Sequence, residues 1–276
     1  MADREVRPHC DSLSPMRCLL LLAAAAATLP AQLAPPNAGG ISIGHIHLMV
    51  ADPEEHKKLW VGILGAEVVR AGSLEMYKLP GVIVIAGKAR TPTTDGSEGS
   101  TVNHFGFLVP SYADLRAKLT AAGITFASDN PTTKQIMARF PDKINVEFTE
   151  SADVKAPTFH HIHVSTPDQE KARAWYLKTF GAREGMRGQF PAAFIPGGEV
   201  DFRKAQQAES PTKGRSLDHI GFEVKNLKAF CEKLQADGVT MEMAYREMPQ
   251  LDGLKIAFLV DPEGTRIELT EGLAGR

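Results

Sequence analysis

The sequence has few cysteines, and they are not placed to form a framework. Its 276 residues include three, Cys10, Cys18 and Cys231, and two of these lie within the first 18 positions. Cys231 is then the single cysteine of the remaining chain, on a segment that we expect to be helical. A disulfide framework and a cysteine-ligated metal site are therefore both excluded.

The sequence also lacks an excess of basic residues. Its formal net charge is -2 and its isoelectric point is near 6.5. Proteins that bind nucleic acid or anionic membrane surfaces carry clustered lysine and arginine. We therefore expect no nucleic-acid partner and no membrane-surface partner.

A hydrophobic run long enough to span a membrane is missing as well. The apolar run Cys18–Leu29 follows Arg17, and small residues around Ala25–Ala27 fit a cleavage pattern. This pattern is typical of a secretory signal rather than a single-pass anchor, which is the alternative. We expect residues 1–31 to be a signal peptide with an upstream extension before Met16. The mature protein would be exported, periplasmic or secreted, and free of the membrane.

Most of the remaining chain consists of repeats. "GHIHLMVADPEEHKKLWVGILGAEVV" (44–69) aligns without gaps on "HHIHVSTPDQEKARAWYLKTFGAREG" (160–185), a shift of 116 that places His45 on His161. "NHFGFLVPSYADLRAKLTAAGITF" (103–126) aligns on "DHIGFEVKNLKAFCEKLQADGVTM" (218–241), which places His104 on His219. Each quarter predicts a strand, an amphipathic helix that ends at a glycine, and three short strands.

This pattern predicts an α+β protein of four βαβββ modules paired into two cup-shaped sheets. The segment "SADVKAP" (151–157) divides the chain into halves. We expect residues 41–150 to form a first domain of two modules and residues 158–272 to form a second. Each domain would then close into its own cup.

The motifs "DHIGFEV" and "DPEGTRIELTE" in paired βαβββ modules resemble the vicinal oxygen chelate superfamily. This superfamily includes glyoxalase I, epimerases, type I extradiol dioxygenases and bleomycin-resistance proteins. The resemblance covers residues 41–272 and implies glyoxalase-like sheets. It also implies that metal ligands come from the first and last strands of the modules.

The histidines and glutamates of the repeats form a ligand pattern. His45, His104, His161 and His219 share one motif position in apolar strands, where imidazole is uncommon without a partner. Two modules end with a carboxylate at one matching position, Glu147 and Glu268. Two histidines and one carboxylate are a metal-binding set with open coordination positions.

The resemblance assigns these six residues to two sites, one in each half. His161, His219 and Glu268 would bind metal in the second half, and His45, His104 and Glu147 in the first. The ion would be divalent: Fe(II), Mn(II), Ni(II), Co(II) or Zn(II).

Four further residues are candidates for roles around the metal. Asp201 aligns with Ile85 and sits where glyoxalase I carries an additional carboxylate ligand, so Asp201 and Glu268 are candidate catalytic carboxylates. A solvent-facing edge position is the other interpretation of Asp201. Strand alternation puts Arg203, His163 and His47 on the inner face as candidate substrate-binding groups.

Three functions fit this pattern. The first is a metal-dependent lyase, isomerase or epimerase acting on a small substrate that chelates the metal through vicinal oxygens. The second is an extradiol-type dioxygenase with non-haem Fe(II), although the resemblance implies a tyrosine where this chain has Phe258. The third is a small-molecule-binding protein of the bleomycin-resistance type. The protein would be a monomer or a homodimer.

Overall fold

The computed structural model describes residues 32–91 and 95–276. The expected signal peptide and extension at residues 1–31 lie outside the described residues. The described chain repeats strand, helix and three strands four times, as predicted. Among the described residues, no helix has the length and apolar character needed to cross a membrane.

The first two modules fill the first half of the chain. The first comprises β1 (Ile41–Val50), α1 (Pro53–Lys57) with the π-helical turn η1 (Lys58–Ile63), β2 (Glu67–Ala71), β3 (Leu74–Leu79) and β4 (Val82–Lys88). The second comprises β5 (Val102–Val109), α2 (Tyr112–Ala121), β6 (Thr125–Asn130), β7 (Gln135–Phe140), the short 3-10 turn η2 (Pro141–Lys143) and β8 (Ile144–Glu150).

The other two modules fill the second half. The third comprises β9 (Thr158–Thr166), α3 (Gln169–Phe180), β10 (Arg183–Arg187), β11 (Phe190–Ile195) and β12 (Gly198–Lys204). The fourth comprises β13 (Leu217–Val224), α4 (Leu227–Ala236), β14 (Met241–Met248), the 3-10 turn η3 (Pro249–Leu251), β15 (Leu254–Val260) and β16 (Arg266–Glu271).

The helices begin and end where the repeats predict. Side chains of Asp52, Ser111, Asp168 and Asn226 cap the four N-termini by accepting backbone N–H hydrogen bonds. The glycine expected after each helix is present, and Gly181 has a φ of 60° directly after α3. Such a left-handed residue ends a helix at little cost only if it is glycine.

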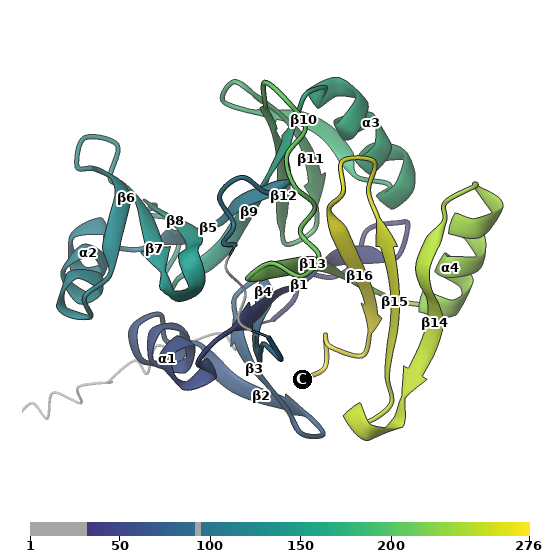
Figure 1. Cartoon of the computed structure of the whole chain (residues 1–276), viewed down its shortest axis with the longest axis horizontal. Helices are drawn as coiled ribbons and strands as arrows, with labels where there is room; N and C mark the ends of the chain where they lie inside the picture. The colour runs from purple at the N-terminus through teal and green to yellow at the C-terminus, as the bar shows by residue number, and fades with distance from the viewer. Residues whose placement is uncertain (1–31, 92–94) are drawn as a thin grey trace, which may run out of the picture.

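The strands form two sheets of eight, but each sheet combines modules from both halves. The first sheet has the order β14-β15-β16-β13-β1-β4-β3-β2, and the second has the order β10-β11-β12-β9-β5-β8-β7-β6 (Figure 1). The prediction of two sheets is confirmed. The prediction that residues 41–150 close one cup and 158–272 the other was wrong, because module 1 pairs with module 4 and module 2 with module 3.

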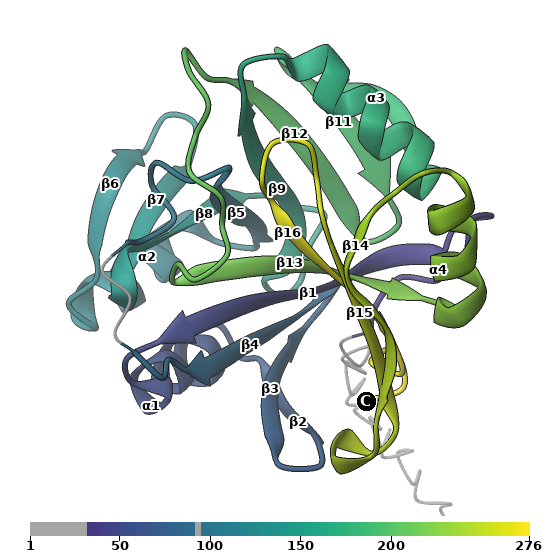
Figure 2. The ribbon, with the colours of Figure 1, turned by 45° about the vertical axis from the view of Figure 1, so that its right-hand side comes forward.

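Within each sheet, the two modules are joined through an antiparallel pair of their opening strands. β1 pairs with β13, so that His47 lies opposite His219, and the two strands run side by side in Figure 2. β5 pairs with β9, so that His104 lies opposite His163. Because all four opening strands share one motif, each could pair with any other, and the local sequence does not select the partner.

The two modules of each half do not share a sheet, but they pack against each other through their helices and the convex faces of the sheets. Trp60 of η1 packs on Phe105 and Phe140 of module 2, with ring centroids 6.0 and 5.2 Å apart. Phe180 of α3 packs on Phe222 of module 4 at 4.7 Å. Both contacts belong to one buried core that draws residues from all four modules. Figure 1 shows α1 beside α2 and α3 beside α4.

Two Pro-Gly turns link the sheets in a reciprocal way. The carbonyl of Pro80 accepts a hydrogen bond from the amide of Phe159, and that of Pro196 accepts one from the amide of Ile43, both at 2.9 Å. These equivalent bonds reflect the pseudo-symmetry of the repeats, and each attaches a turn of one sheet to an opening strand of the other.

Candidate metal centres

Each sheet curls so that its concave face forms a cup. In the first sheet the amide of Gly72, in the β2–β3 turn, donates to Asp252 beside β15 at 2.8 Å, although β2 and β15 lie near opposite edges. We call this concave face the apolar cup. In the second sheet the side chain of Arg187 on edge strand β10 reaches Glu147 on β8. We call this face the polar cup.

The apolar cup brings together four candidate ligands. Donor atoms of His45, His47, His219 and Glu268 lie within 4.8 Å of one another. The Nε2 atoms of His45 and His219 lie 2.9 and 2.8 Å from the same Oε2 of Glu268. All but the half-buried His47 are buried.

The polar cup contains the equivalent set. Donor atoms of His104, His161 and His163 lie within 4.8 Å of one another. Nε2 of His104 is 3.5 Å from Oε2 of Glu147, and Nε2 of His161 is 3.6 Å from its Oε1. All four residues are buried.

The six predicted ligands therefore cluster, but in a different grouping from the prediction. His45 joins His219 and Glu268, and His161 joins His104 and Glu147. Relative to the assignment by halves, the two sites exchange one histidine. The reason is the crossed pairing of the modules, which places β1 with β13 and β9 with β5.

The residue before three of these histidines holds the imidazole in place. Nδ1 of His104 is 2.9 Å from Oδ1 of Asn103, and Nδ1 of His219 is 2.6 Å from Oδ1 of Asp218. When Nδ1–H donates to these oxygens, the Nε2 lone pair faces the site, as in most protein metal centres. Strand alternation predicts that His160 faces away, yet its Nδ1 lies 3.0 Å from Nδ1 of His161.

Two glycines make room for the other histidine rings. Gly106 pairs with His161 across the strands, and a Cβ at Gly106 would lie 2.2 Å from that ring. Gly221 pairs with His45, and a Cβ there would lie 2.1 Å from the ring. The glycine two residues after His104 and His219 in the motif is thus required by the close approach of the opposing imidazole.

The buried polar atoms fit a metal ion. Nε2 of His104 and of His161 are buried and have no hydrogen-bond partner within the described chain, and both point toward Glu147. A buried polar atom without a partner costs folding free energy, and a divalent ion bound by both nitrogens would remove that cost. Imidazole nitrogens with a carboxylate are a suitable donor set for the predicted divalent ions.

The protonation states of Glu147, Glu268 and His163 also suit ligation, whereas hydrogen bonds with Asp218 and Glu268 outweigh burial and raise the pKa of His219. Burial opposes ionisation of Glu147, but its contact with His104 outweighs this and lowers the pKa to about 2. Burial likewise opposes ionisation of Glu268, and hydrogen bonds with His219 and His45 hold its pKa well below the usual range. Burial lowers the pKa of His163 to about 3, so this imidazole is neutral at pH 7. Carboxylates and neutral imidazoles are the forms that bind metal.

Asp201 lies in the polar cup and is fully buried, so the solvent-facing interpretation was wrong. It pairs with His163 across β12 and β9, and their side chains are 3.7 Å apart. Burial and the neighbouring charge of Glu199 raise its pKa to about 8, although Arg187 donates to its Oδ2 at 3.2 Å. Oδ1 is buried and has no partner among the described residues. Glu268, the other candidate catalytic carboxylate, lies in the other cup.

Arg187 is a site residue that the sequence analysis missed. Its Nη1 lies 3.1 Å from Nε2 of His163, its Nη2 lies 3.3 Å from Glu147, and its Nε lies 3.3 Å from Glu199. The equivalent position in the other half is Ala71, at the same place on strand β2. That contrast between the repeats, a small residue against an arginine, is the signal that could have found it.

The three predicted substrate-binding residues divide between the cups. His163 and Arg203 lie beside the polar site: Arg203 is charged near His163 and its Nε is buried without a partner in the described chain. His47 lies in the apolar cup, 4.5 Å from the ring of His219.

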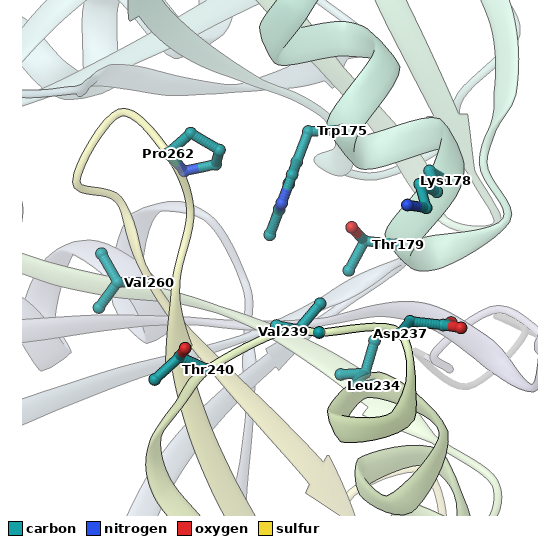
Figure 3. Close-up of a pocket in the computed structure, with 10 residues that line it drawn as sticks. Trp175, Lys178, Thr179, Leu234, Asp237, Val239, Thr240, Val260 and Pro262 are labelled. Carbon is teal, nitrogen blue, oxygen red and sulfur yellow. The ribbon is translucent and has the colours of Figure 1, made fainter.

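A separate pocket of about 310 Å³ lies on the outer side of the molecule. It is bounded by α3 and by the end of α4, with Trp175 pointing into it and Lys178 and Asp237 at its rim (Figure 3). None of its lining residues belongs to a cup, so it has no part in the metal centres.

Comparison with known proteins agrees with this architecture. A family model described as the glyoxalase/bleomycin resistance protein/dioxygenase superfamily matches residues 42–148 and 158–269. The chain therefore belongs to this superfamily. No curated protein sequence matches the chain significantly.

Two solved structures share the fold at low sequence identity. Glyoxalase I from Zea mays is 16% identical, with a TM-score of 0.64 over 84% of this chain and 92% of that one. A proposed dioxygenase from Bacillus subtilis subsp. subtilis str. 168 is 15% identical, with a TM-score of 0.62 over 88% of each chain. At this identity the similarity concerns the fold alone.

Proposed function

We propose that the protein is a divalent-metal-dependent enzyme of lyase, isomerase or epimerase type. Its substrate is a small molecule that offers two vicinal oxygens to the metal. The observation that carries the proposal is the placement of Asp201, a buried carboxylic acid, beside the His104, His161 and Glu147 set.

The ligand sets would hold one ion in each cup. The ion, when bound, supplies Lewis-acid polarisation of the substrate oxygens, which acidifies an adjacent C–H bond. Asp201 is the candidate base in the polar cup, because its Oδ1 is unpaired and a pKa near 8 suits proton uptake from carbon near neutral pH. Arg187 holds Asp201 through Oδ2 and so orients the free oxygen. Glu268 is the corresponding carboxylate of the apolar cup.

Metal analysis followed by an activity screen tests the proposal. The purified chain should bind divalent metal, and it should turn over small 2-oxo or 2-hydroxy carbonyl compounds, or exchange their α-protons with deuterium, without consuming oxygen. Asp201→Asn should lower exchange in the polar cup by about 100-fold, the usual contribution of a general base. A chain that binds metal and such compounds without turnover or exchange would be a binding protein instead.

Dioxygenase activity is the second candidate, since each cup offers two histidines and one carboxylate. Phe258, the position where the extradiol resemblance implies a tyrosine, packs 5.2 Å from the ring of His219, and Met137 takes its place in the polar cup. Neither has a group that transfers a proton. Oxygen uptake by the Fe(II)-loaded protein, measured with catechols under air and under nitrogen, would favour this candidate.

Export and the partners are part of the same proposal. We propose that the chain acts outside the inner membrane, alone or as a homodimer, with a small-molecule substrate as its partner. Fractionation of the expressing cells and light scattering of the purified chain test both points.

A further inference from the structure

Apart from its candidate ligands and the paired side chains of Lys78 and Arg266, the interior of the apolar cup is largely hydrophobic. A buried cluster separate from the main core lies on this face. It consists of Leu33, Val69, Ala71, Met76, Ile83, Ile85, Leu254, Ile256, Phe258 and Leu273. Strand register places this cluster at the ligands, because Ile83 lies opposite His45 and Phe258 opposite Glu268.

The equivalent positions of the polar cup carry charge. Register defines the equivalence: Ile83 pairs with His45 as Glu199 pairs with His161. The same register makes each residue of β4 equivalent to one residue of β12. The gapless alignment of the repeats makes each residue of β2 equivalent to one residue of β10. Four positions change from small or apolar to charged: Ala71 to Arg187, Ile83 to Glu199, Ile85 to Asp201 and Gly87 to Arg203.

The mouths of the cups differ as well. In the apolar cup the fully buried Leu273 and the nearly buried Leu33 complete the hydrophobic cluster. The side chain of Arg276 donates to Asp252 at 2.9 Å, and Figure 1 shows the C-terminal end between β3 and β15. The charged side chains at this face are already paired within the chain. Lys78, opposite Ile83 on β3, donates to the carbonyl of Arg276. Arg266, whose guanidinium lies 4.1 Å from the ring centroid of Phe258, donates to Asp218 and Glu242.

The two arginines of the polar cup retain hydrogen-bonding capacity. A guanidinium has five N–H groups. Nη2 of Arg187 has one contact within the described chain, to Glu147, so one of its N–H groups is left for a ligand. Nε of Arg203 is buried and has no partner among the described residues, and its charge acts on His163. Two arginines with unsatisfied donors therefore lie near His163.

The charge balance favours an anion in this cup. Arg187, Arg203 and a divalent ion would carry four positive charges against at most three negative charges, those of Glu147, Glu199 and Asp201. In a buried site, such a surplus and free guanidinium donors select a carboxylate, which pairs with guanidinium in a charge-assisted geometry.

We propose that the two cups take different ligands, and that Arg187 and Arg203 determine the choice. The polar cup binds a small substrate that carries a carboxylate besides its two metal-chelating oxygens. The apolar cup binds a neutral, apolar counterpart. This inference rests on the proposed metal-dependent function and adds its substrate class.

A matched pair of chelators tests it by binding rather than by activity. Succinate monohydroxamate and pentanohydroxamate chelate through the same two oxygens and differ in one end, a carboxylate against an ethyl group. The chain is loaded with Co(II), and each probe is titrated by calorimetry and by the visible spectrum of the ion. His219→Ala isolates the polar cup and His104→Ala isolates the apolar cup, each after circular dichroism confirms the fold. Glu268→Gln and Glu147→Gln replace them if either fails to fold.

The expected result is an opposite preference in the two cups. The isolated polar cup should bind the carboxylate probe at least about tenfold more tightly, since a charge-assisted hydrogen bond contributes that much. Arg187→Ala and Arg203→Ala should each weaken this probe by about tenfold and change the ethyl probe less than about twofold. Arg139→Ala, which removes an exposed arginine from β7 of the same sheet, should change neither.

Two other results overturn the inference in distinguishable ways. The inference is contradicted if both cups prefer the same probe, or if Arg187→Ala binds the carboxylate probe as tightly as the parent does. In either case the bound Co(II) shows that the metal site is intact, so the proposed function is not contradicted. Failure of the unmodified chain to bind Co(II) overturns the proposed function and the inference together.

Discussion

The guanidinium of Arg187 lies 3.3 Å from the carboxylate of Glu147, although β11, β12, β9 and β5 separate their strands in the sheet. The two residues also come from different halves of the sequence. This contact crosses the concave face and shows that the polar site is assembled by the curl of the second sheet. It places a positive charge directly beside a candidate metal ligand.

The crossed grouping of the ligands predicts metal stoichiometry. His45→Ala combined with His219→Ala should lose one of two ions, because both residues belong to the apolar cup. His45→Ala combined with His104→Ala should lose both, because it disables one histidine in each cup. Elemental analysis of the dialysed variants measures this directly. The opposite pattern would mean that the sites follow the halves of the sequence.

The glycine beneath each histidine ring predicts a site-specific defect. Gly106→Ala places a Cβ 2.2 Å from the ring of His161, so the imidazole must move or the strands must separate. We expect a destabilisation of about 1–3 kcal/mol and a weakened metal site in the polar cup alone. Denaturant unfolding and metal titration measure the two effects. Gly62→Ala in η1, where a Cβ meets nothing within 4 Å, is the control. It should leave metal binding unchanged and should not lower the stability, because alanine is favoured over glycine in a helix.

The raised pKa of Asp201 predicts a pH-dependent stability in the metal-free chain. Its carboxyl holds a proton in the folded state up to about pH 8 but loses it near pH 4 when unfolded, so folding binds the proton between these values. Stability should therefore fall as the pH rises from 4 toward 8.

Asp201→Asn removes this contribution. The unfolding free energy of the variant minus that of the parent should therefore rise from pH 5 to pH 9. The rise should reach up to about 4 kcal/mol, because each pKa unit corresponds to about 1.4 kcal/mol. Urea unfolding at the two pH values, with chelator present, provides the measurement. Asp153→Asn, an exposed position in the loop between the halves, serves as the control. An equal effect of Asp201→Asn at both pH values would mean that Asp201 is ionised throughout.

Metal removal should destabilise the chain, because the ligand nitrogens are buried and, in the polar cup, unpaired. At a free metal concentration about 100 times the dissociation constant, each site adds about 2.7 kcal/mol. Chelation should therefore lower the melting temperature by several degrees, and by about half as much in Glu147→Gln or Glu268→Gln. A melting temperature that does not respond to chelator would contradict the assignment of metal to these residues.

Much of the fold could be read from the repeats. The recurrence of "HIGF"-like strands, of helix-ending glycines and of Pro-Gly turns sets the four modules, since each feature reflects local backbone geometry. The six residues His45, His104, His161, His219, Glu147 and Glu268 could be chosen for the same reason, since their equivalence under the repeat is local information. Asp201 also emerged from comparison of the repeats, by its contrast with Ile85.

The tertiary structure alone decided which of these residues share a site. Strand pairing depends on long-range packing, and the four opening strands are too similar for the local sequence to select their partners. Trp60 and Phe180 pack the helical segments against modules of their own halves, and the sheets pair modules from opposite halves. It also decided the part played by Arg187, whose long side chain reaches Glu147 only because the sheet curls. The sequence by itself determined the modules and their chemistry; the crossing of the modules and the curl of the sheets determined two cups of opposite polarity.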